Sequence, residues 1–395
     1  MELDYSQAGF TEKQIFNTAV KLLPTINEMN SIVKTRNWAS DYASLLLPSE
    51  KTFLHQSHRV LKQVKADNFI VVGIGGSNLG TLALQEPLGK KIFYADTTDP
   101  DHLKSIIKQC KGKTLVNIVS KSGSTTETIA NACTLLKELK NYEVIVTTDS
   151  GSKLDKEAEQ NGWLVLEVPS RVGGRYSVFS NVGLLPLAWS GLNTTKLLDG
   201  AELMIESCMS NDVEENPAAI LASLIYLNYQ KNRVVFDQFL FSNDLEALGK
   251  WYRQLLGESI GKHGIALTPT VSIGSTDLHS MGQSYLGGAD NKFYRIVNSK
   301  FKNSAIVPKN NLAPNLNGKS FNKIMNSIST GFQTALANRK KPFVSFNIDK
   351  TEEELGGLMQ LEMVEVMLLA KLLKVNAFDQ PQVEEYKKHT RKLLK

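Results

Sequence analysis

A run of hydroxyl side chains at Ser120–Thr128 is well suited to bind an anion. Six of these nine residues are Ser or Thr. They follow a β-branched run at 114–119, typical of a buried parallel strand, and precede the start of a helical pattern. Free backbone N–H groups and the positive dipole end at a helix start favour phosphate. A capping box formed by Ser124 and Glu127 is the alternative, although a cap needs only one hydroxyl.

A glycine-rich loop at 73–80 follows an earlier apolar run at 69–74. Its glycines partly match the dinucleotide fingerprint, with the wrong final spacing, and Asp96 follows about 20 residues on, where that fingerprint has an acid. Glycines let the backbone approach a ligand closely, and Ser77 adds a hydroxyl. The loop predicts contact with a sugar phosphate. Nucleotide binding and a purely structural turn are the alternatives.

Two further motifs supply a candidate cation and a candidate base. Arg175 follows Gly173 and Gly174, and arginine offers an oxyanion a planar fork that stays charged. Glu258 lies at the end of a predicted helix among apolar neighbours, a setting that suits proton transfer by a carboxylate. The alternatives are a surface arginine beside a tight turn and an exposed loop glutamate.

His279 lies in a polar turn just before a predicted helix, whereas the other five histidines have charged or helical neighbours. There is no second His or Cys at ligand spacing around it. The sequence therefore favours acid–base chemistry over metal binding at His279. A turn histidine without a chemical role is the alternative.

Alternating strand and helix patterns must position these residues. Strands are predicted in the first half at 69–74, 91–96, 115–119, 142–148 and 163–168, and in the second half at 233–237, 293–297 and 342–348. Helices between them indicate parallel, helix-covered sheets of the doubly wound kind. The predicted division is an N-terminal helical segment at 1–40, α/β units at 41–192 and 193–348, and C-terminal helices at 349–395.

Composition narrows the class of protein. The net charge of +5 comes from 45 basic and 40 acidic residues spread along the chain, which does not suit nucleic acid, and the basic run at 387–392 is interpreted as a solvated helix face. Three scattered cysteines favour a reducing compartment. The sequence has neither an N-terminal signal pattern nor an 18-residue apolar run, so we expect a cytoplasmic protein without a membrane partner.

Taken in order, these stretches resemble the glucose-6-phosphate isomerase (phosphoglucose isomerase) family, in its bacterial form. The most specific matches are at 173–177, 257–262 and 378–387, and the run at 277–283 is similar to the bacterial branch. The resemblance implies two sugar-isomerase (SIS) domains. Each would be a mainly parallel sheet flanked by helices in a flavodoxin-like three-layer sandwich, with a C-terminal helical segment completing the site.

The resemblance also implies the reaction and the residues that carry it. Glucose 6-phosphate and fructose 6-phosphate would interconvert through an enediol(ate), as in glycolysis and gluconeogenesis. Glu258 would move the proton between C1 and C2, Arg175 would lie beside the enediol(ate), and His279 with Lys387 would open the ring. Residues expected to bind substrate are Gly76, Ser77, Ser120, Ser122, Thr125, Thr128, Gln254 and Gln380. No metal or nucleotide cofactor is expected, and the family implies a homodimer in which His279 crosses the interface.

Two departures from the family pattern stand out. The chain looks short for the family, and Ile260 occupies a position that is polar in some relatives, which would alter the setting of Glu258. Two other functions are weighed. A catalytically silent sugar-phosphate sensor would lack the acid–base residues that this sequence keeps. A nucleotide-dependent oxidoreductase rests only on the loop at 73–80.

Overall fold

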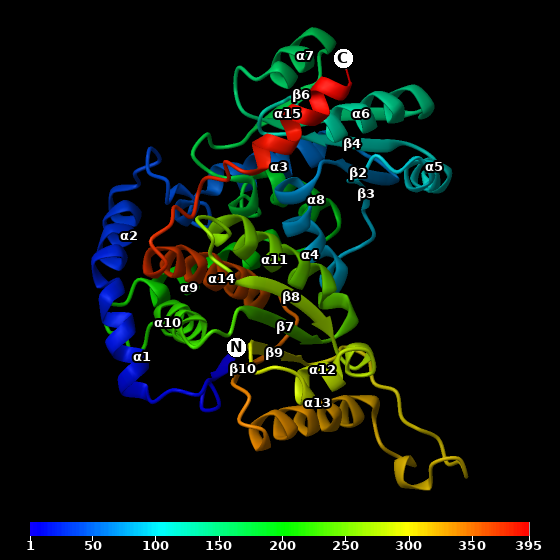
Figure 1. Ribbon diagram of the computed structural model, residues 1–395. Coiled ribbons are helices and arrows are strands. Elements are labelled where there is room, and N and C mark those ends of the chain that lie inside the picture. Colours follow the sequence, from blue (N-terminus) through cyan, green and yellow to red (C-terminus); the bar gives the residue numbers. More distant parts are fainter. Residues whose placement is uncertain (395) are drawn as a thin grey trace.

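The first sheet of the computed structural model, which describes residues 1–394, is entirely parallel and has the strand order β3-β2-β4-β5-β6 (Figure 1). Its strands are β2 (Asn68–Val72), β3 (Phe93–Ala95), β4 (Thr114–Val119), β5 (Tyr142–Thr148) and β6 (Leu164–Glu167). Every residue of the central strand β4 is buried. Such continuous burial is typical of a parallel sheet covered on both faces, and it confirms the predicted fold class.

Helices cover both faces of this sheet because alternate strand residues point to opposite sides. Phe69 and Val71 pack with α3 (Lys51–Gln63) and α8 (Asn181–Trp189). Ile70 packs on the other face, where the covering helices are α5 (Pro100–Gln109), α6 (Thr126–Glu138) and α7 (Lys153–Asn161).

The second sheet has the order β1-β10-β9-β7-β8. Its strands are β1 (Glu2–Asp4), β7 (Val235–Phe241), β8 (Thr268–Ile273), β9 (Lys292–Ser299) and β10 (Phe343–Ile348). All neighbours are parallel except β1, which pairs antiparallel with β10. Sequence analysis missed β8, an edge strand with a proline and alternating hydroxyls, and β1, which lies in a segment predicted to be helical. The predicted domain bounds stay a prediction.

The two sheets share one topology. In the runs of four strands that begin with β2 and with β7, the second strand lies on one side of the first, and the third and fourth lie on its other side, as the orders β3-β2-β4-β5 and β8-β7-β9-β10 show. Strand order reverses between β2 and β4, and ligands of doubly wound sheets bind at such switch points. The glycine-rich loop follows β2 and the hydroxyl-rich loop follows β4, so the fold places them side by side.

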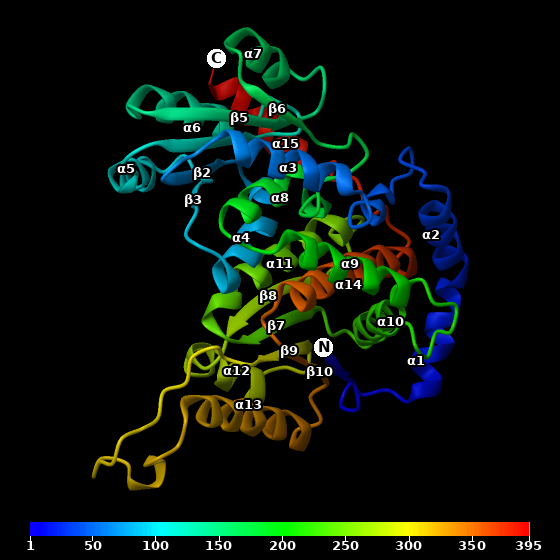
Figure 2. The ribbon, with the colours of Figure 1, turned by 180° about the vertical axis from the view of Figure 1, so that it is seen from behind.

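A helical layer lies between the two sheets in both views (Figures 1 and 2). Its helices include α4 (Leu79–Leu88), α9 (Thr194–Cys208), α10 (Pro217–Gln230), α11 (Glu246–Ile260) and α14 (Glu352–Leu372). Residues 355–370 of α14 are all buried, as expected for a helix packed on every side. Helices α9 and α14 approach closely, since a Cβ on Gly200 would lie 1.9 Å from the Glu353 carbonyl oxygen.

The remaining helices complete the outer surface. They are α1 (Glu12–Ala19), α2 (Leu23–Thr35), α12 (Gly282–Gly287), α13 (Phe321–Asn338) and α15 (Val383–Leu393). Helices α12 and α13 cover the outer face of the second sheet, where Tyr285 and Phe332 pack with Phe239. No described helix is long and apolar enough to cross a membrane.

A buried ionic cluster joins the second sheet to the central helices. The Arg295 guanidinium on β9 donates to Glu362 Oε1 at 2.9 Å and to Glu365 Oε2, and both glutamates belong to α14. Tyr252 of α11 donates to Glu365, and Gln238 of β7 donates to Glu362. Burial raises the pKa of Glu362 to about 8, although Arg295 opposes that shift. Folding therefore favours the protonated form of Glu362.

We predict that Glu362→Gln changes how stability depends on pH. In the wild type the folded pKa lies above the unfolded value, so the stabilisation is complete below about pH 4.5 and is lost as pH rises through about 8. Gln keeps the neutral shape and does not titrate, so the variant should gain about 1 kcal/mol or more relative to wild type between pH 5 and 8. The free energy of unfolding of both proteins, measured with urea at pH 5 and at pH 8, tests this prediction.

The exposed substitution Glu159→Gln on α7 is the control for that experiment. It should leave the pH dependence of the unfolding free energy as in the wild type. Parallel pH profiles for wild type and Glu362→Gln would contradict the prediction.

Candidate active site

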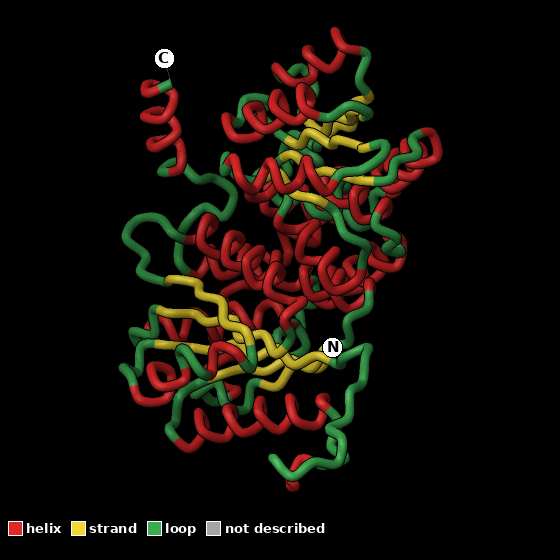
Figure 3. The backbone as a smooth tube through the Cα atoms, turned by 90° about the vertical axis from the view of Figure 1, so that its right-hand side faces the viewer, coloured by secondary structure: helices red, strands yellow, loops and turns green. Residues whose placement is uncertain are grey.

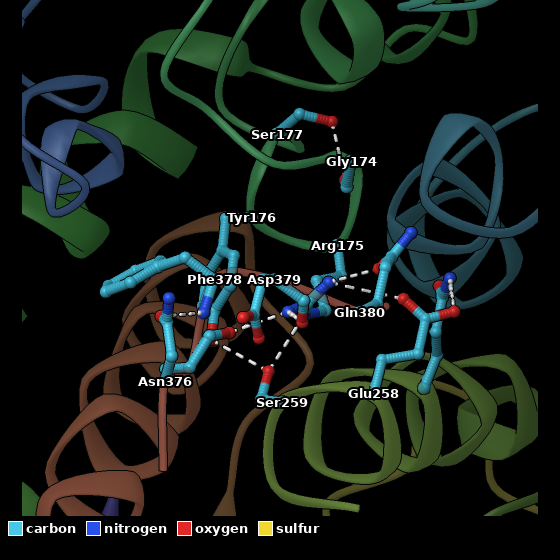
Figure 4. Close-up of polar contacts among 12 residues, drawn as sticks. Gly174, Arg175, Tyr176, Ser177, Glu258, Ser259, Asn376, Phe378, Asp379 and Gln380 are labelled. Atoms are coloured by element: carbon cyan, nitrogen blue, oxygen red, sulfur yellow. Dashed lines mark hydrogen bonds and ion pairs between the residues drawn. The ribbon is translucent and has the colours of Figure 1, made fainter. Parts of the chain in front are cut away.

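The Arg175 side chain lies at the centre of a hydrogen-bond network that links distant parts of the chain (Figure 4). It belongs to the short 3₁₀ turn η4 (Gly174–Tyr176) and is 3% exposed. A guanidinium has five N–H donors. They are directed to Ser259 Oγ at 2.8 Å, Glu258 Oε2 at 3.4 Å, Gln380 Oε1 at 2.5 Å, the Ala377 carbonyl at 2.6 Å and the Asp379 carbonyl at 3.3 Å.

Glu258 presents its carboxylate to this cation from the last turn of α11. One oxygen faces Arg175, and the other accepts a hydrogen bond of 3.0 Å from Gln254 Nε2, one helical turn earlier. The Glu258 side chain is 29% exposed, so a ligand can reach it. The apolar neighbours that sequence analysis placed around it, Leu255 and Ile260 among them, point into the core. The carboxylate therefore has polar partners and not the expected apolar setting.

The glycine-rich loop packs against both of these motifs. A Cβ on Gly76 would lie 2.2 Å from the Gly174 carbonyl carbon and 2.5 Å from the Arg175 nitrogen. Gly75 has φ +64°, and a Cβ there would lie 2.9 Å from Gln254 Nε2. The glycines of η3 (Gly75–Ser77) thus permit a close approach of two backbones within this chain.

The hydroxyl-rich loop lies next to η3 at the start of α6. A Cβ on Gly73 would lie 2.9 Å from the carbonyl oxygen of Val119, the last residue of β4. The Ser120 and Thr125 hydroxyls are 3.0 Å apart. Thr128 is 1% exposed, and its hydroxyl has no hydrogen-bond partner among residues 1–394.

The capping alternative for this loop is wrong. The N-cap residue of α6 is Thr125 and not Ser124, and within the described chain the Thr125 side chain makes no capping hydrogen bond. The Ser122 hydroxyl instead accepts hydrogen bonds from the Ser124 amide at 3.4 Å and the Ser124 hydroxyl at 3.2 Å. The hydroxyls and the first-turn N–H groups of α6 are arranged as an anion site requires.

Lys387 on α15 faces the same loop. It lines a cavity of about 130 Å³ together with Ser122 and Thr125, and its Nζ lies 3.0 Å from Glu384 Oε1. The structure thus brings Lys387 to the hydroxyl-rich loop although more than 250 residues separate them in sequence.

The segment 376–380, which leads into α15, is fixed by two buried cations. Arg175 donates to its carbonyls, and Lys262 Nζ contacts the Asn376 carbonyl and lies 2.6 Å from Asp379 Oδ1. Lys262 is 5% exposed. Sequence analysis did not assign a role to Lys262 or Ser259, although both belong to the 257–262 motif. Their closeness to Glu258 in the sequence was the one signal that could have pointed to a role. The burial of Lys262 could not be predicted, because it depends on partners far along the chain.

His279 is the predicted site residue that the fold of one chain does not bring to the others. It is exposed and follows the turn η6 (Thr276–Leu278) after β8. Helix α11 runs antiparallel to β8, because Gly249 packs against Val271 and Gly257 packs against Pro269. Glu258 therefore lies beside the start of β8 and His279 beyond its end, a strand length of about 16 Å away.

This arrangement can support proton transfer next to a carbonyl group. A reachable carboxylate faces a fixed cation, which can stabilise the negative oxygen of an enediolate. The start of α6, with its hydroxyls and free N–H groups, has the chemistry to hold a remote phosphate. Among residues 1–394 there is no group of three or more His, Cys, Asp or Glu side chains that could hold a metal ion.

Comparisons with known proteins identify the family. The family model described as phosphoglucose isomerase matches residues 57–315. A glucose-6-phosphate isomerase of Methanocaldococcus jannaschii is 32% identical over 339 residues, which cover 83% of this chain and 84% of that protein.

Solved structures agree with the fold. A hypothetical protein of Thermus thermophilus superposes with a TM-score of 0.90 at 29% identity, covering 100% of this chain and 99% of that one. A glucose-6-phosphate isomerase of Chlamydia trachomatis has a TM-score of 0.83 over 99% of this chain and 88% of its own, and at 19% identity it shows the fold alone. The family match and the identity to the Methanocaldococcus enzyme show that the chain belongs to the phosphoglucose isomerase family.

Proposed function

We propose that this chain interconverts glucose 6-phosphate and fructose 6-phosphate by ring opening and proton transfer between C2 and C1 through an enediol(ate). Family membership supports the reaction. The observation that carries the residue roles is the Glu258–Arg175 pair, 3.4 Å apart, beside a hydroxyl-lined helix start. The catalytically silent sensor would lack this pair. The glycine-rich loop that suggested a nucleotide packs against Gly174 and Gln254.

The phosphate group anchors the substrate at the start of α6. Ser120, Ser122, Thr125 and Thr128 donate hydroxyl hydrogen bonds to it, and the first turn of α6 adds backbone N–H groups and its dipole. Binding energy from this remote group orients the reacting carbons. Gly76 and Ser77 line the sugar between the two ends of the site.

Glu258 removes the proton from one carbon and returns it to the next, and such a positioned base contributes on the order of 10²–10⁴-fold. Arg175 stabilises the enediolate oxygen without giving up its own proton. Gln254 and Gln380 orient these two groups, because Gln254 donates a hydrogen bond to Glu258 and Gln380 accepts one from Arg175. Ring opening is assigned to His279 and Lys387, because an imidazole can both donate and accept a proton.

A homodimer would supply His279 to the neighbouring subunit's site. Two features support this proposal. His279 lies far from Glu258 within one chain, and the segment between β9 and α13 extends away from the body in Figures 1 and 2. That segment exposes Leu312 at 99% and Ile306 at 64%. It follows the carboxyl end of β9, and His279 follows the carboxyl end of β8, so both lie toward the same end of this parallel sheet. Two-fold dimers are the commonest assembly. A cytoplasmic location is part of the same proposal.

The assignment of the base predicts that Glu258→Gln lowers kcat by at least 10²-fold, because Gln cannot accept the proton. Binding of 6-phosphogluconate should stay within several-fold of wild type. A coupled assay and titration calorimetry measure these two quantities. The matched control is Glu246→Gln at the start of the same helix, which removes only an exposed ion pair to Lys250. Near wild-type turnover by folded Glu258→Gln would refute the assignment.

A hybrid-dimer experiment tests whether His279 acts in the neighbouring site. Glu258→Gln and His279→Gln chains, each inactive alone, are co-expressed with different tags. In a hybrid dimer, one site combines both defects and the other has an intact Glu258 with an intact His279. Random pairing makes half the dimers hybrids, so the mixture should recover about one quarter of wild-type activity. Hybrid dimers without activity would show that His279 acts within its own chain, and a His279→Gln chain that is active alone would show that His279 has no role in the reaction.

A further inference from the structure

A cavity of about 130 Å³ separates the start of α6 from one face of α15. On the α6 side its lining includes the hydroxyls of Ser122 and Thr125. On the α15 side it includes two cations, Lys387 and Arg391, together with Glu384. Lys387 has a proposed role in ring opening, whereas Arg391 has none.

The three charged residues of α15 share one face of the helix. Glu384, Lys387 and Arg391 are spaced i, i+3 and i+7, which places them in a row. Glu384 Oε1 lies 3.0 Å from Lys387 Nζ, and Glu384 Oε2 lies 3.6 Å from Arg391 Nη2. The hydrogen bond from Lys387 and the charges of both cations lower the pKa of Glu384. One carboxylate is thus the counter-ion of both cations at the cavity.

These ion pairs are exposed and easily exchanged. The side chains of Glu384, Lys387 and Arg391 are 51%, 36% and 52% exposed. Water screens such pairs, and they contribute little to stability. Glu127, on the first turn of α6, is the other acid that lines the cavity. The two cations, Lys387 and Arg391, are therefore balanced by the two acids, Glu127 and Glu384, only while Glu384 stays at the cavity.

Helix α15 itself is held lightly. None of its described residues is buried. Figure 3 shows it standing beside the first sheet and joined to the body by a loop. That loop is the segment 376–380, which Arg175 and Lys262 fix. The helix is therefore placed by its fixed base, and burial of apolar surface does not hold it.

We propose that Arg391 is an additional phosphate-binding residue and that Glu384 is the counter-ion that the substrate phosphate displaces. The inference rests on the proposed function, because it takes the start of α6 as the phosphate site. A phosphate dianion offers several acceptor oxygens, which match the planar fork of arginine. Displacement of Glu384 frees Arg391 for the phosphate and Lys387 for the sugar. The favoured ligand is a dianionic phosphate ester.

The test compares two pairs of matched variants of the full-length chain. Arg391→Gln removes the proposed contact, and Lys392→Gln makes the same charge change at an exposed neighbour. Glu384→Gln removes the competing anion, and Glu385→Gln is its neighbouring control. Neither Lys392 nor Glu385 is among the described residues that line the cavity. Calorimetric titration with 6-phosphogluconate and with inorganic phosphate gives the Kd for each.

The two central variants should change affinity in opposite directions. Arg391→Gln should weaken both ligands by about tenfold, as loss of one charged hydrogen bond does. Glu384→Gln should strengthen both by a few-fold, and the controls should stay within about twofold. If Arg391→Gln bound like Lys392→Gln, or if Glu384→Gln also weakened binding, the inference would be overturned.

Failure of the inference can be told apart from failure of the proposed function. The titration does not depend on turnover. A wild-type chain that binds both ligands through Arg391 but does not isomerise would refute the proposed function and support the phosphate contact. A wild-type chain that isomerises, with Arg391→Gln unchanged in Kd and KM, would refute the inference alone.

Discussion

The buried guanidinium of Arg175 is the interaction on which the site depends. A charge 3% exposed is tolerated only when its donors are satisfied, and all five N–H groups have acceptors. Only one of those acceptors, Glu258, is charged. The positive charge is therefore positioned by neutral groups and remains available to a developing oxyanion. Its fixed position also fixes the distance to the proposed base.

The same network explains why three parts of the chain meet. Arg175 comes from the end of the first unit, Glu258 and Ser259 come from α11, and Gln380 comes from the segment that leads to α15. Because Gly76 has no side chain, the glycine-rich loop after β2 lies directly against the backbone of Gly174 and Arg175. The glycine-rich loop and the Glu258–Arg175 pair thus belong to one set of contacts, and α15 is attached to it through residues 376–380.

Much of this could be predicted from sequence, because the features are local. Apolar runs located all the strands of the first sheet, and the hydroxyl cluster was correctly placed at the start of a helix, α6. That this helix start binds an anion stays a prediction. What sequence could not show depends on long-range packing. Edge strand β8 was hidden by Pro269 and its hydroxyls. The burial of Lys262 follows from Asp379, 117 residues away. The run at 387–392 was interpreted as a solvated face, yet Lys387 and Arg391 line a cavity with α6.

The central claim is that one substrate spans the hydroxyl-lined helix start and the Glu258–Arg175 pair. A crystal structure with 6-phosphogluconate tests it most directly. We predict its phosphate within hydrogen-bond distance of Ser120, Ser122, Thr125 and Thr128, with the first two carbons between Glu258 and Arg175. A phosphate bound away from the start of α6, or a sugar chain that does not reach Glu258, would contradict the account.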